Sequence, residues 1–569
     1  MLCAALVGLS ILATWPVAEI GINDDWSYIR TTQVFAQTHH FVYNAWSTAM
    51  LGWQVIWGAL FAGLFGPSHT SIRLSIIPIR LATALLYHAI LRRFGLNRAH
   101  AIFGTLVLTL CPLFLALANT FMTDVPGLFS SLLCLYLCQR AIAAAEDRHA
   151  AMWLVVAGLT NILTGTARQV AWLGVLVMVP CCGWLLRRRR FIVPATIVTW
   201  LVGALSIHWL MAWFARQPYS ILVPMFPEQI NLHTLDRIVV PIWRSSMSTL
   251  LFLLPVLVAF AAAVWPPRKS KLIRWIAVFA ALSAVYFVLS IKGRGDIISY
   301  PWLTGNIITP HGVMQDPPLF GSERQAPIGW QLFLVAIFVL CLLGWLDAVR
   351  TFPRRGSELA ERQNRRNMSV LLLPTLLAYA ALLLPFAIRL VIFDRYILFI
   401  LAVVLIFMLR SHQDRIGGRV PSIAFVALTI VALLGIAAVH DLFAIDRAEV
   451  RLVGELQKAG IPRTQIRGGF DFDSITEVDT AGYLNDPHLT NPPNSYHAHL
   501  GTPDQLPPCG YPYLRYVPSL RIRYVISADP TPCLNPTDFP AQSYRTWLPP
   551  ARRELFIGVP SAISPLRQP

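Results

Sequence analysis

Hydrophobic blocks long enough to cross a lipid bilayer recur along almost the whole of this 569-residue chain. A spanning helix needs roughly 20 apolar residues, and blocks of about that length stand at 13 places. Hydrophobic residues make up 56% of the chain and charged residues 13%, whereas a soluble domain has about 45–50% and about 25%. The chain is therefore predicted to be a polytopic membrane protein.

The predicted fold is all-α in the membrane, with about 13 transmembrane helices. They are expected near residues 2–20, 72–92, 99–118, 125–145, 152–168, 170–186, 192–214, 247–265, 275–292, 327–348, 368–388, 396–410 and 421–440. The first block lacks a basic leader and a small-residue cleavage site, so we expect a retained helix. Ala49–Phe65 is apolar and long enough to span, but an extra crossing there would invert every later loop.

The distribution of basic residues decides this point. With Ala49–Phe65 treated as an interfacial helix, 22 basic residues fall on one face, in every alternate loop. Because basic loops stay cytoplasmic, we predict a cytoplasmic N-terminus and a multi-pass protein of the inner or plasma membrane. The net charge of +17 then serves orientation and contacts with membrane lipids. No nucleic-acid partner is expected.

The C-terminal segment differs in composition from the rest. Residues 1–440 form the predicted transmembrane domain, and residues 441–569 the extracytoplasmic domain. The tail holds 18 of the 41 prolines, helical periodicity in "AEVRLVGELQKAG" and short β-like runs such as "RIRYVISA". We predict a small mixed α/β domain rich in turns. Cys509 and Cys533 lie in this tail, where an oxidising compartment would permit a disulfide; two free thiols are the alternative.

Polar side chains gather on the predicted outer face. Its carboxylates are Asp24, Asp25, Asp124 and Asp394, and its cations are Arg73, Arg168, Lys292, Arg294, Arg389 and Arg395. Polar residues at membrane depth are costly and often functional, although a single arginine there more commonly snorkels or forms a salt bridge. Carboxylates beside cations suit a reaction on a phosphate-bearing lipid, because cations hold phosphate and a carboxylate can act as general base.

Several motifs occur in an order that resembles one enzyme family. "INDDWSY" follows the first helix, the segment from Asn44 to Ser75 follows it, and "FMTDVPGLF", "TARQ" and "FDRYILFIL" come later. The chain resembles the GT-C-fold glycosyltransferases over roughly residues 1–410. It looks closest to the bacterial branch related to dolichyl-phosphate-mannose-protein mannosyltransferases and aminoarabinose transferases. Many members have Asp-Glu where this chain has Asp24-Asp25.

The resemblance implies an integral-membrane glycosyltransferase, hexosyl or pentosyl, that inverts the anomeric carbon of a polyprenyl-phosphate sugar donor. The acceptor is unknown and could be a glycan, a lipid or a protein. Asp24 matches the first acid of the motif, which makes it the predicted general base, with Asp25 and Asp124 on the acceptor side. By resemblance, the donor phosphate contacts are expected among six residues: Arg168, Gln169, Lys292, Arg294, Arg395 and Tyr396.

Other interpretations stay open from the sequence. Asp24 and Asp25 could cap the helix that starts at Trp26, because Asp is favoured at helix N-termini. Asp25 could pair with a nearby cation. The pair could hold a divalent metal, although no third ligand is apparent, and no cofactor is predicted. A transporter or flippase of a lipid-linked or small anionic substrate, a scaffold, and a lipid-linked saccharide ligase or polymerase are the alternative functions.

Overall fold

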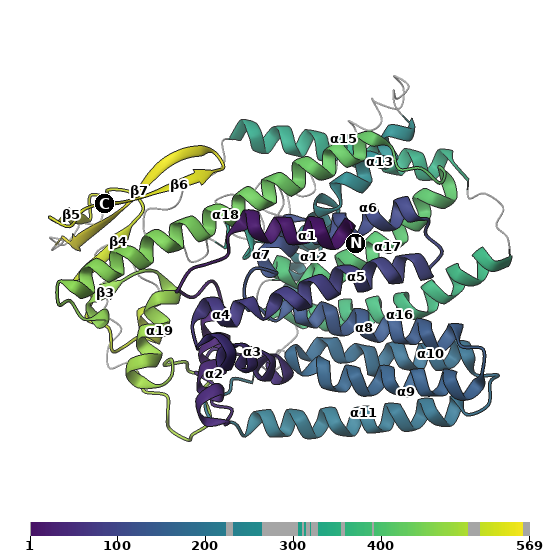
Figure 1. Ribbon diagram of the computed structural model, residues 1–569, viewed down its shortest axis with the longest axis horizontal. Helices are drawn as coiled ribbons and strands as arrows, with labels where there is room; N and C mark the ends of the chain where they lie inside the picture. The colour runs from purple at the N-terminus through teal and green to yellow at the C-terminus, as the bar shows by residue number, and fades with distance from the viewer. Residues whose placement is uncertain are drawn as a thin grey trace.

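The computed structural model describes residues 2–222, 232–264, 305–309, 312–314, 319, 328–353, 359–389, 392–498 and 513–561. Helices dominate, and most of them run side by side in one bundle (Figure 1). The helices of the N-terminal half are α1 (Leu2–Thr14), α2 (Asp25–Thr38), α3 (Gly52–Phe65), α4 (His69–Leu74), α5 (Ile76–Arg93), α6 (Arg98–Thr109), α7 (Pro112–Leu117), α8 (Asp124–Ala143), α9 (Asp147–Thr164), α10 (Val179–Leu186), α11 (Ile192–Ala215), α12 (Leu232–Phe252) and α13 (Leu254–Val264).

The second half continues the bundle and then leaves it. Its helices are α15 (Ile328–Thr351), α16 (Leu359–Arg389), α17 (Leu398–Arg415), α18 (Ser422–Lys458) and α19 (Phe470–Ala481). The 3-10 turn η4 (Asp394–Ile397) leads into α17, while η1 (Gly165–Ala167) and η2 (Gln169–Trp172) flank Arg168. A polytopic helical membrane protein is confirmed, because nine helices of the described ranges are long and apolar enough to span a bilayer, or ten with the bent pair Pro241–Phe252 and Leu254–Val264.

The predicted count of about 13 spans is not confirmed. The helix expected at 2–20 ends at Thr14, because Trp15 precedes Pro16 and a residue before proline is disfavoured in the helical conformation. The block 99–118 is broken into α6 and α7 at Pro112, which has no N–H to continue the helix. The helix expected at 275–292 lies outside the described residues.

Short helices gather at one end of the bundle. In Figure 1, α2, α3 and α4 lie at the left-hand end, on the side where α19 and the C-terminal sheet are found. The apolar segment predicted to lie at the interface is α3, a helix of 14 residues, shorter than the roughly 20 that a span requires. The loops that carry Asp24, Asp124 and Arg168 meet beside these short helices.

The tail is joined to the bundle by one continuous helix. α18 runs for 37 residues, so the boundary predicted between residues 440 and 441 falls inside it. Beyond α18 lie α19 and a small sheet made of β3 (Ile466–Arg467), β4 (Tyr524–Ser527), β5 (Leu534–Pro536), β6 (Gln542–Trp547) and β7 (Pro550–Pro560). β3 and β4 are parallel, and β7 pairs antiparallel with β4, β5 and β6. A small α/β domain is confirmed.

Contacts at the middle of α18 orient the sheet. The carboxylate of Asp441 accepts hydrogen bonds from the N–H groups of Trp547 and Leu548, at 2.7 and 2.8 Å. The ring of His440 stacks on Trp547, with 3.9 Å between ring centroids. Cys533 is disulfide-bonded, while Cys509, its predicted partner, lies outside the described residues.

Candidate active site

The side chains of Asp24 and Asp25 occupy different surroundings. Asp25 is fully buried and forms a two-point ion pair with Arg73, with Nε–Oδ2 and Nη2–Oδ1 distances of 2.7 and 3.0 Å. Its oxygens also accept the N–H groups of Ile22 at 2.7 Å and Phe121 at 3.2 Å. Because these four bonds use both oxygens, Asp25 fastens the loop around residue 22 to the loop that leads to Asp124.

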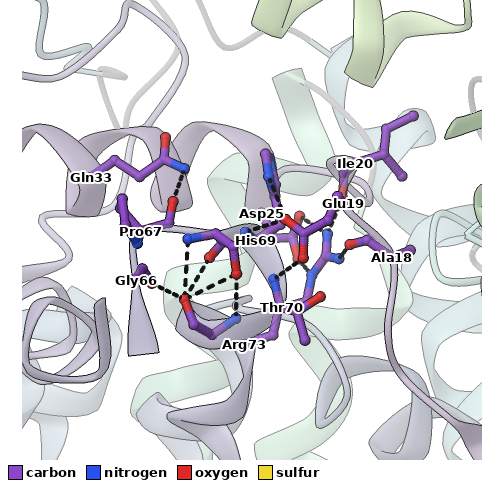
Figure 2. A network of polar contacts seen from close by, with 12 residues as sticks. Ala18, Glu19, Ile20, Asp25, Gln33, Gly66, Pro67, His69, Thr70 and Arg73 are labelled. Atoms are coloured by element: carbon purple, nitrogen blue, oxygen red, sulfur yellow. Dashed lines mark hydrogen bonds and ion pairs between the residues drawn. The ribbon is translucent and has the colours of Figure 1, made fainter. Parts of the chain in front are cut away.

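Arg73 is the centre of this junction (Figure 2). Besides Asp25, its guanidinium donates to the carbonyl groups of Ala18, at 2.8 Å, and Ile20. Glu19, on the same stretch, accepts the N–H groups of His69 and Thr70 at the start of α4. Burial acts to raise the pKa of Glu19, but the hydrogen bonds from Thr70 and His69 together lower that pKa below its ordinary value. The first loop is thereby fixed to α4.

Asp24 points to a second cluster of charges. Its Oδ2 is ion-paired with Nη1 of Arg395, and its Oδ1 accepts the indole N–H of Trp46 at 2.8 Å. Its side chain keeps 18% of its surface exposed. Asp24 stands at the N-cap position of α2, but its side chain makes no capping hydrogen bond there. The capping alternative therefore has no support for Asp24.

A second ion pair lies beside the first. Nη1 of Arg168 is 2.6 Å from Oδ1 of Asp124 and donates to the hydroxyl of Thr123 at 3.1 Å. Asp124 is almost fully buried. No described residue reaches either oxygen of Asp124 with good hydrogen-bond geometry. The carboxylate thus has the charge of Arg168 next to it and unused capacity to accept a hydrogen bond.

Tyr396 lies close to both arginines. The guanidinium carbons of Arg168 and Arg395 are 5.3 and 5.5 Å from the centre of its ring, within reach of cation–π attraction. Tyr396 is held through its backbone, because its carbonyl accepts the hydroxyl of Tyr379 at 2.7 Å. Both arginines and Asp124 line one small pocket, whose other walls are Gly127, Leu128, Ser131, Val170, Tyr379, Leu398 and Phe399. Three segments far apart in sequence therefore meet at one polar pocket with apolar walls.

The fourth carboxylate of the predicted outer face has another role. Asp394 is fully buried and accepts the N–H groups of Ile307, Ile308 and Arg395, at 3.0, 2.7 and 2.8 Å. It holds a short two-stranded segment, β1 (Ile308–Thr309) and β2 (Gly312–Val313), against η4. Asp394 thereby fixes the turn that presents Arg395.

The predicted phosphate ligands divide into three groups. Arg168, Arg395 and Tyr396 come together as described. The side-chain amide of Gln169 instead donates to the carbonyl of Thr48, at 3.1 Å, and ties η2 to the segment before α3. Lys292 and Arg294 lie outside the described residues. Arg168 and Arg395 are therefore the predicted cations that the described structure brings to the pocket.

Three side chains at the site were missed from the sequence. Trp46 binds Asp24, Tyr379 holds Tyr396, and Tyr28 lies in the field of both ion pairs. Burial raises the pKa of Tyr28 well above its ordinary value, and the charge of Asp24 adds to the rise, so its hydroxyl stays protonated. The position of Trp46 within the segment that resembles the family's juxtamembrane helices was the available signal. No pattern pointed to Tyr379.

The metal hypothesis can be compared with the geometry. Both oxygens of Asp25 accept hydrogen bonds from Arg73 and two backbone N–H groups. Asp24 and Asp25 therefore do not converge on one metal position. Within the described residues, no group of three or more His, Cys, Asp or Glu side chains is arranged to hold a metal ion.

Solved structures that are similar to this chain are membrane glycosyltransferases of the GT-C fold, the class that the motifs resemble. ArnT from Cupriavidus metallidurans bound to undecaprenyl phosphate shares 15% identity over 83% of each chain, with a TM-score of 0.39. The archaeal oligosaccharyltransferase AglB from Archaeoglobus fulgidus, in complex with an inhibitory peptide and a dolichol-phosphate, shares 14% identity over 92% of this chain and 69% of its own, with a TM-score of 0.39.

A third similarity is more partial. The S. cerevisiae protein O-mannosyltransferase Pmt1-Pmt2 complex bound to the sugar donor shares 12% identity, and the match covers 39% of this chain and 34% of that chain, with a TM-score of 0.31. No protein-family model and no curated protein sequence matches the chain. At these low identities and TM-scores the similarities carry no argument about the reaction, so the function is argued from the pocket.

Proposed function

We propose that this protein is an integral-membrane glycosyltransferase that moves a sugar from a polyprenyl-phosphate donor to an acceptor hydroxyl on the outer face of the membrane. One observation carries the proposal: two arginines from distant segments, Arg168 and Arg395, meet in a pocket that Asp124 also lines, and Asp24 is ion-paired with Arg395. Paired guanidinium groups suit a phosphate, and a nearby carboxylate suits the hydroxyl that attacks. The sugar and the acceptor stay open.

The arginines have capacity for a phosphate. Among the described residues, the buried Nε of Arg395 has no hydrogen-bond partner, and an unsatisfied buried donor costs about 1–3 kcal/mol. A phosphate oxygen in the pocket would satisfy it. The apolar side of the pocket, formed by Leu128, Leu398 and Phe399, would exclude water and strengthen the charge interactions there.

The proposed reaction is a single displacement. The acceptor oxygen attacks the anomeric carbon as the bond between that carbon and the phosphate oxygen breaks. The electrons of the broken bond stay on polyprenyl phosphate, whose charge Arg168 and Arg395 stabilise. Asp24 takes the proton of the acceptor hydroxyl, through the oxygen that faces Arg395 in the free protein, once that arginine turns to the phosphate. The anomeric configuration inverts.

Transfer in proteoliposomes tests this function. Purified protein is reconstituted with a panel of polyprenyl-phosphate monosaccharides that carry labelled sugars, together with a crude acceptor fraction from the cell envelope. We expect one donor to pass its label to the acceptor fraction, and the double variant Arg168→Ala/Arg395→Ala to pass none. If the lipid-linked sugar crosses the bilayer intact and no label is transferred, the protein is a flippase and the proposed function is wrong.

The proposed side of the reaction has its own test. Reporter domains fused after Arg190 and at the C-terminus should report opposite sides of the membrane, because the positive-inside pattern makes the first cytoplasmic and the second extracytoplasmic. Equal accessibility of the two reporters would contradict the orientation, and it would leave the pocket on an unassigned face.

A further inference from the structure

The loop that carries Asp24 is also held from the C-terminal domain. Oδ2 of Asp471, in the first turn of α19, accepts the backbone N–H of Asn23 at 2.9 Å across 448 residues of chain. Asn23 adopts a left-handed conformation with φ of 52°, and its own side-chain oxygen accepts the N–H of Asp24 at 2.9 Å. A non-glycine residue at positive φ is uncommon and needs its surroundings to hold it.

A second contact reaches Asp24 from the same helix. The indole of Trp46, which donates to Asp24, lies against Phe470 and Tyr516 of the C-terminal domain, with ring centroids 4.9 and 5.9 Å apart. Phe470 is the residue next to Asp471. Among the described residues, Trp46 is the partner of the Asp24 side chain besides Arg395, and Asn23 accepts the backbone N–H of Asp24. Both Trp46 and Asn23 contact α19.

We propose that Asp471 is a positioning residue for Asp24, so that the C-terminal domain is a working part of the catalytic centre. The inference rests on the proposed role of Asp24 as general base. A base must lie within hydrogen-bond reach of the proton it removes, and a displacement of about 1 Å can cost roughly 100-fold in rate. Asp471 sets the backbone of the residue just before the base, where a small rotation moves the carboxylate by about that much.

Another acid on α19 provides a matched control. Asp479 also connects the C-terminal domain to α2, through an ion pair with Arg30 at 3.1 Å. Its carboxylate makes no described contact with the loop of Asn23 and Asp24. If α19 acted only as a structural connection, removal of either acid would affect the enzyme in a similar way. If Asp471 positions the base, only Asp471 should affect the catalytic step.

The experiment combines hydrogen exchange with kinetics on the full-length protein. Asp471→Ala is expected to speed amide exchange in a peptide covering residues 20–28 and to lower kcat by roughly 10- to 100-fold, with the KM for the polyprenyl-phosphate sugar changed less than about twofold. Asp471→Asn keeps an oxygen that can accept the N–H of Asn23, so it should restore both readouts. Asp479→Ala should leave both near wild type.

The outcomes separate this inference from the proposed function. Unchanged exchange in Asp471→Ala, or faster exchange with an unchanged kcat, overturns the positioning role. An equal loss of kcat in Asp479→Ala also overturns it, because docking of the domain would then be sufficient. Transfer by Asp24→Asn at the wild-type rate would instead reject Asp24 as the base, while the exchange result would still report whether Asp471 holds the loop.

Discussion

The two neighbouring acids of the first loop can be compared directly, because one peptide bond separates them and each pairs with an arginine, yet their burial and their other partners differ. Asp25 is sealed from solvent and uses both oxygens on Arg73 and two backbone N–H groups. Asp24 keeps part of its surface open, beside the pocket that Arg395 lines. A carboxylate with all its acceptor sites occupied can hold structure, whereas one with exchangeable partners can take a proton.

The comparison predicts that chemistry depends on Asp24 more than on any other residue of the loop. Asp24→Asn keeps the shape and can still accept the N–H of Trp46, but it has no basicity at neutral pH. We expect kcat for sugar transfer to fall by about 10²- to 10⁴-fold, with a smaller loss of thermal stability than in Asp25→Ala, because the Asn oxygen can still accept a hydrogen bond from Arg395. A variant that transfers sugar within a few-fold of wild type would remove the distinction between the two acids.

The opposite pattern is expected one residue later. Asp25→Ala leaves the buried charge of Arg73 without its paired carboxylate, and breaking a buried ion pair costs about 3–5 kcal/mol. We expect a clear drop in melting temperature, measured in detergent by tryptophan fluorescence. The double variant Asp25→Ala/Arg73→Met should lose much less than the two single variants together. Additive losses would show that the pair does not act as one structural unit.

The two arginines of the pocket are expected to act in donor binding. Arg395→Ala and Arg168→Ala each remove a charged hydrogen-bond donor, worth about 1.5–3 kcal/mol, so the affinity for polyprenyl phosphate should fall by roughly 10- to 100-fold. Binding can be measured by stabilisation of the purified protein against heat as the lipid is added. Gln169→Ala serves as the control, because its amide donates to the carbonyl of Thr48 and it is not among the residues that line the pocket. Equal losses in all three variants would place the phosphate elsewhere.

A pH effect at Asp471 is the smallest expected change. Burial raises the pKa of Asp471 well above its ordinary value of 3.8, and the charge of Asp25 adds to the rise. A raised pKa in the folded state means that stability is lost as the pH climbs above about 4. Asp471→Asn stays neutral, so its melting temperature should gain on wild type by a few degrees between pH 4 and 8. A gap that is constant over this range would contradict the shift.

The sequence predicted the site residues that lie within recognisable motifs. Asp24, Asp124, Arg168 and Arg395 all reach one region, since each stands at the end of an apolar segment and the alternation of basic loops assigned those ends to one face. Membrane helices can also be predicted from the sequence, because the bilayer sets their length and composition. Pro16 and Pro112 are the sequence signals of the two helix breaks, but the apolar runs around them favour uninterrupted helices.

What the sequence could not supply is the partner of each charge. Arg73 is one of six cations on the predicted outer face. No local pattern predicts that Arg73 pairs with Asp25 and that Arg395 pairs with Asp24. The contact between Asp471 and Asn23 joins segments 448 residues apart, and tertiary packing alone decides it. Asp394 carried the same chemistry as Asp24 in the sequence, yet three backbone N–H groups occupy it.

The unbroken course of α18 has a consequence for how this chain can change in length. A helix of 37 residues is about 55 Å long and turns by roughly 100° per residue. An insertion or deletion of one residue between the bundle and Lys458 would therefore swing α19 around the helix axis by that angle and carry Asp471 away from Asn23. Changes of seven residues, close to two full turns, nearly preserve the rotational phase but shift the domain by about 10 Å along the axis. The helix thus fixes both the distance and the rotational angle between the bundle and the C-terminal domain, so residues can be inserted without moving that domain only in the loops.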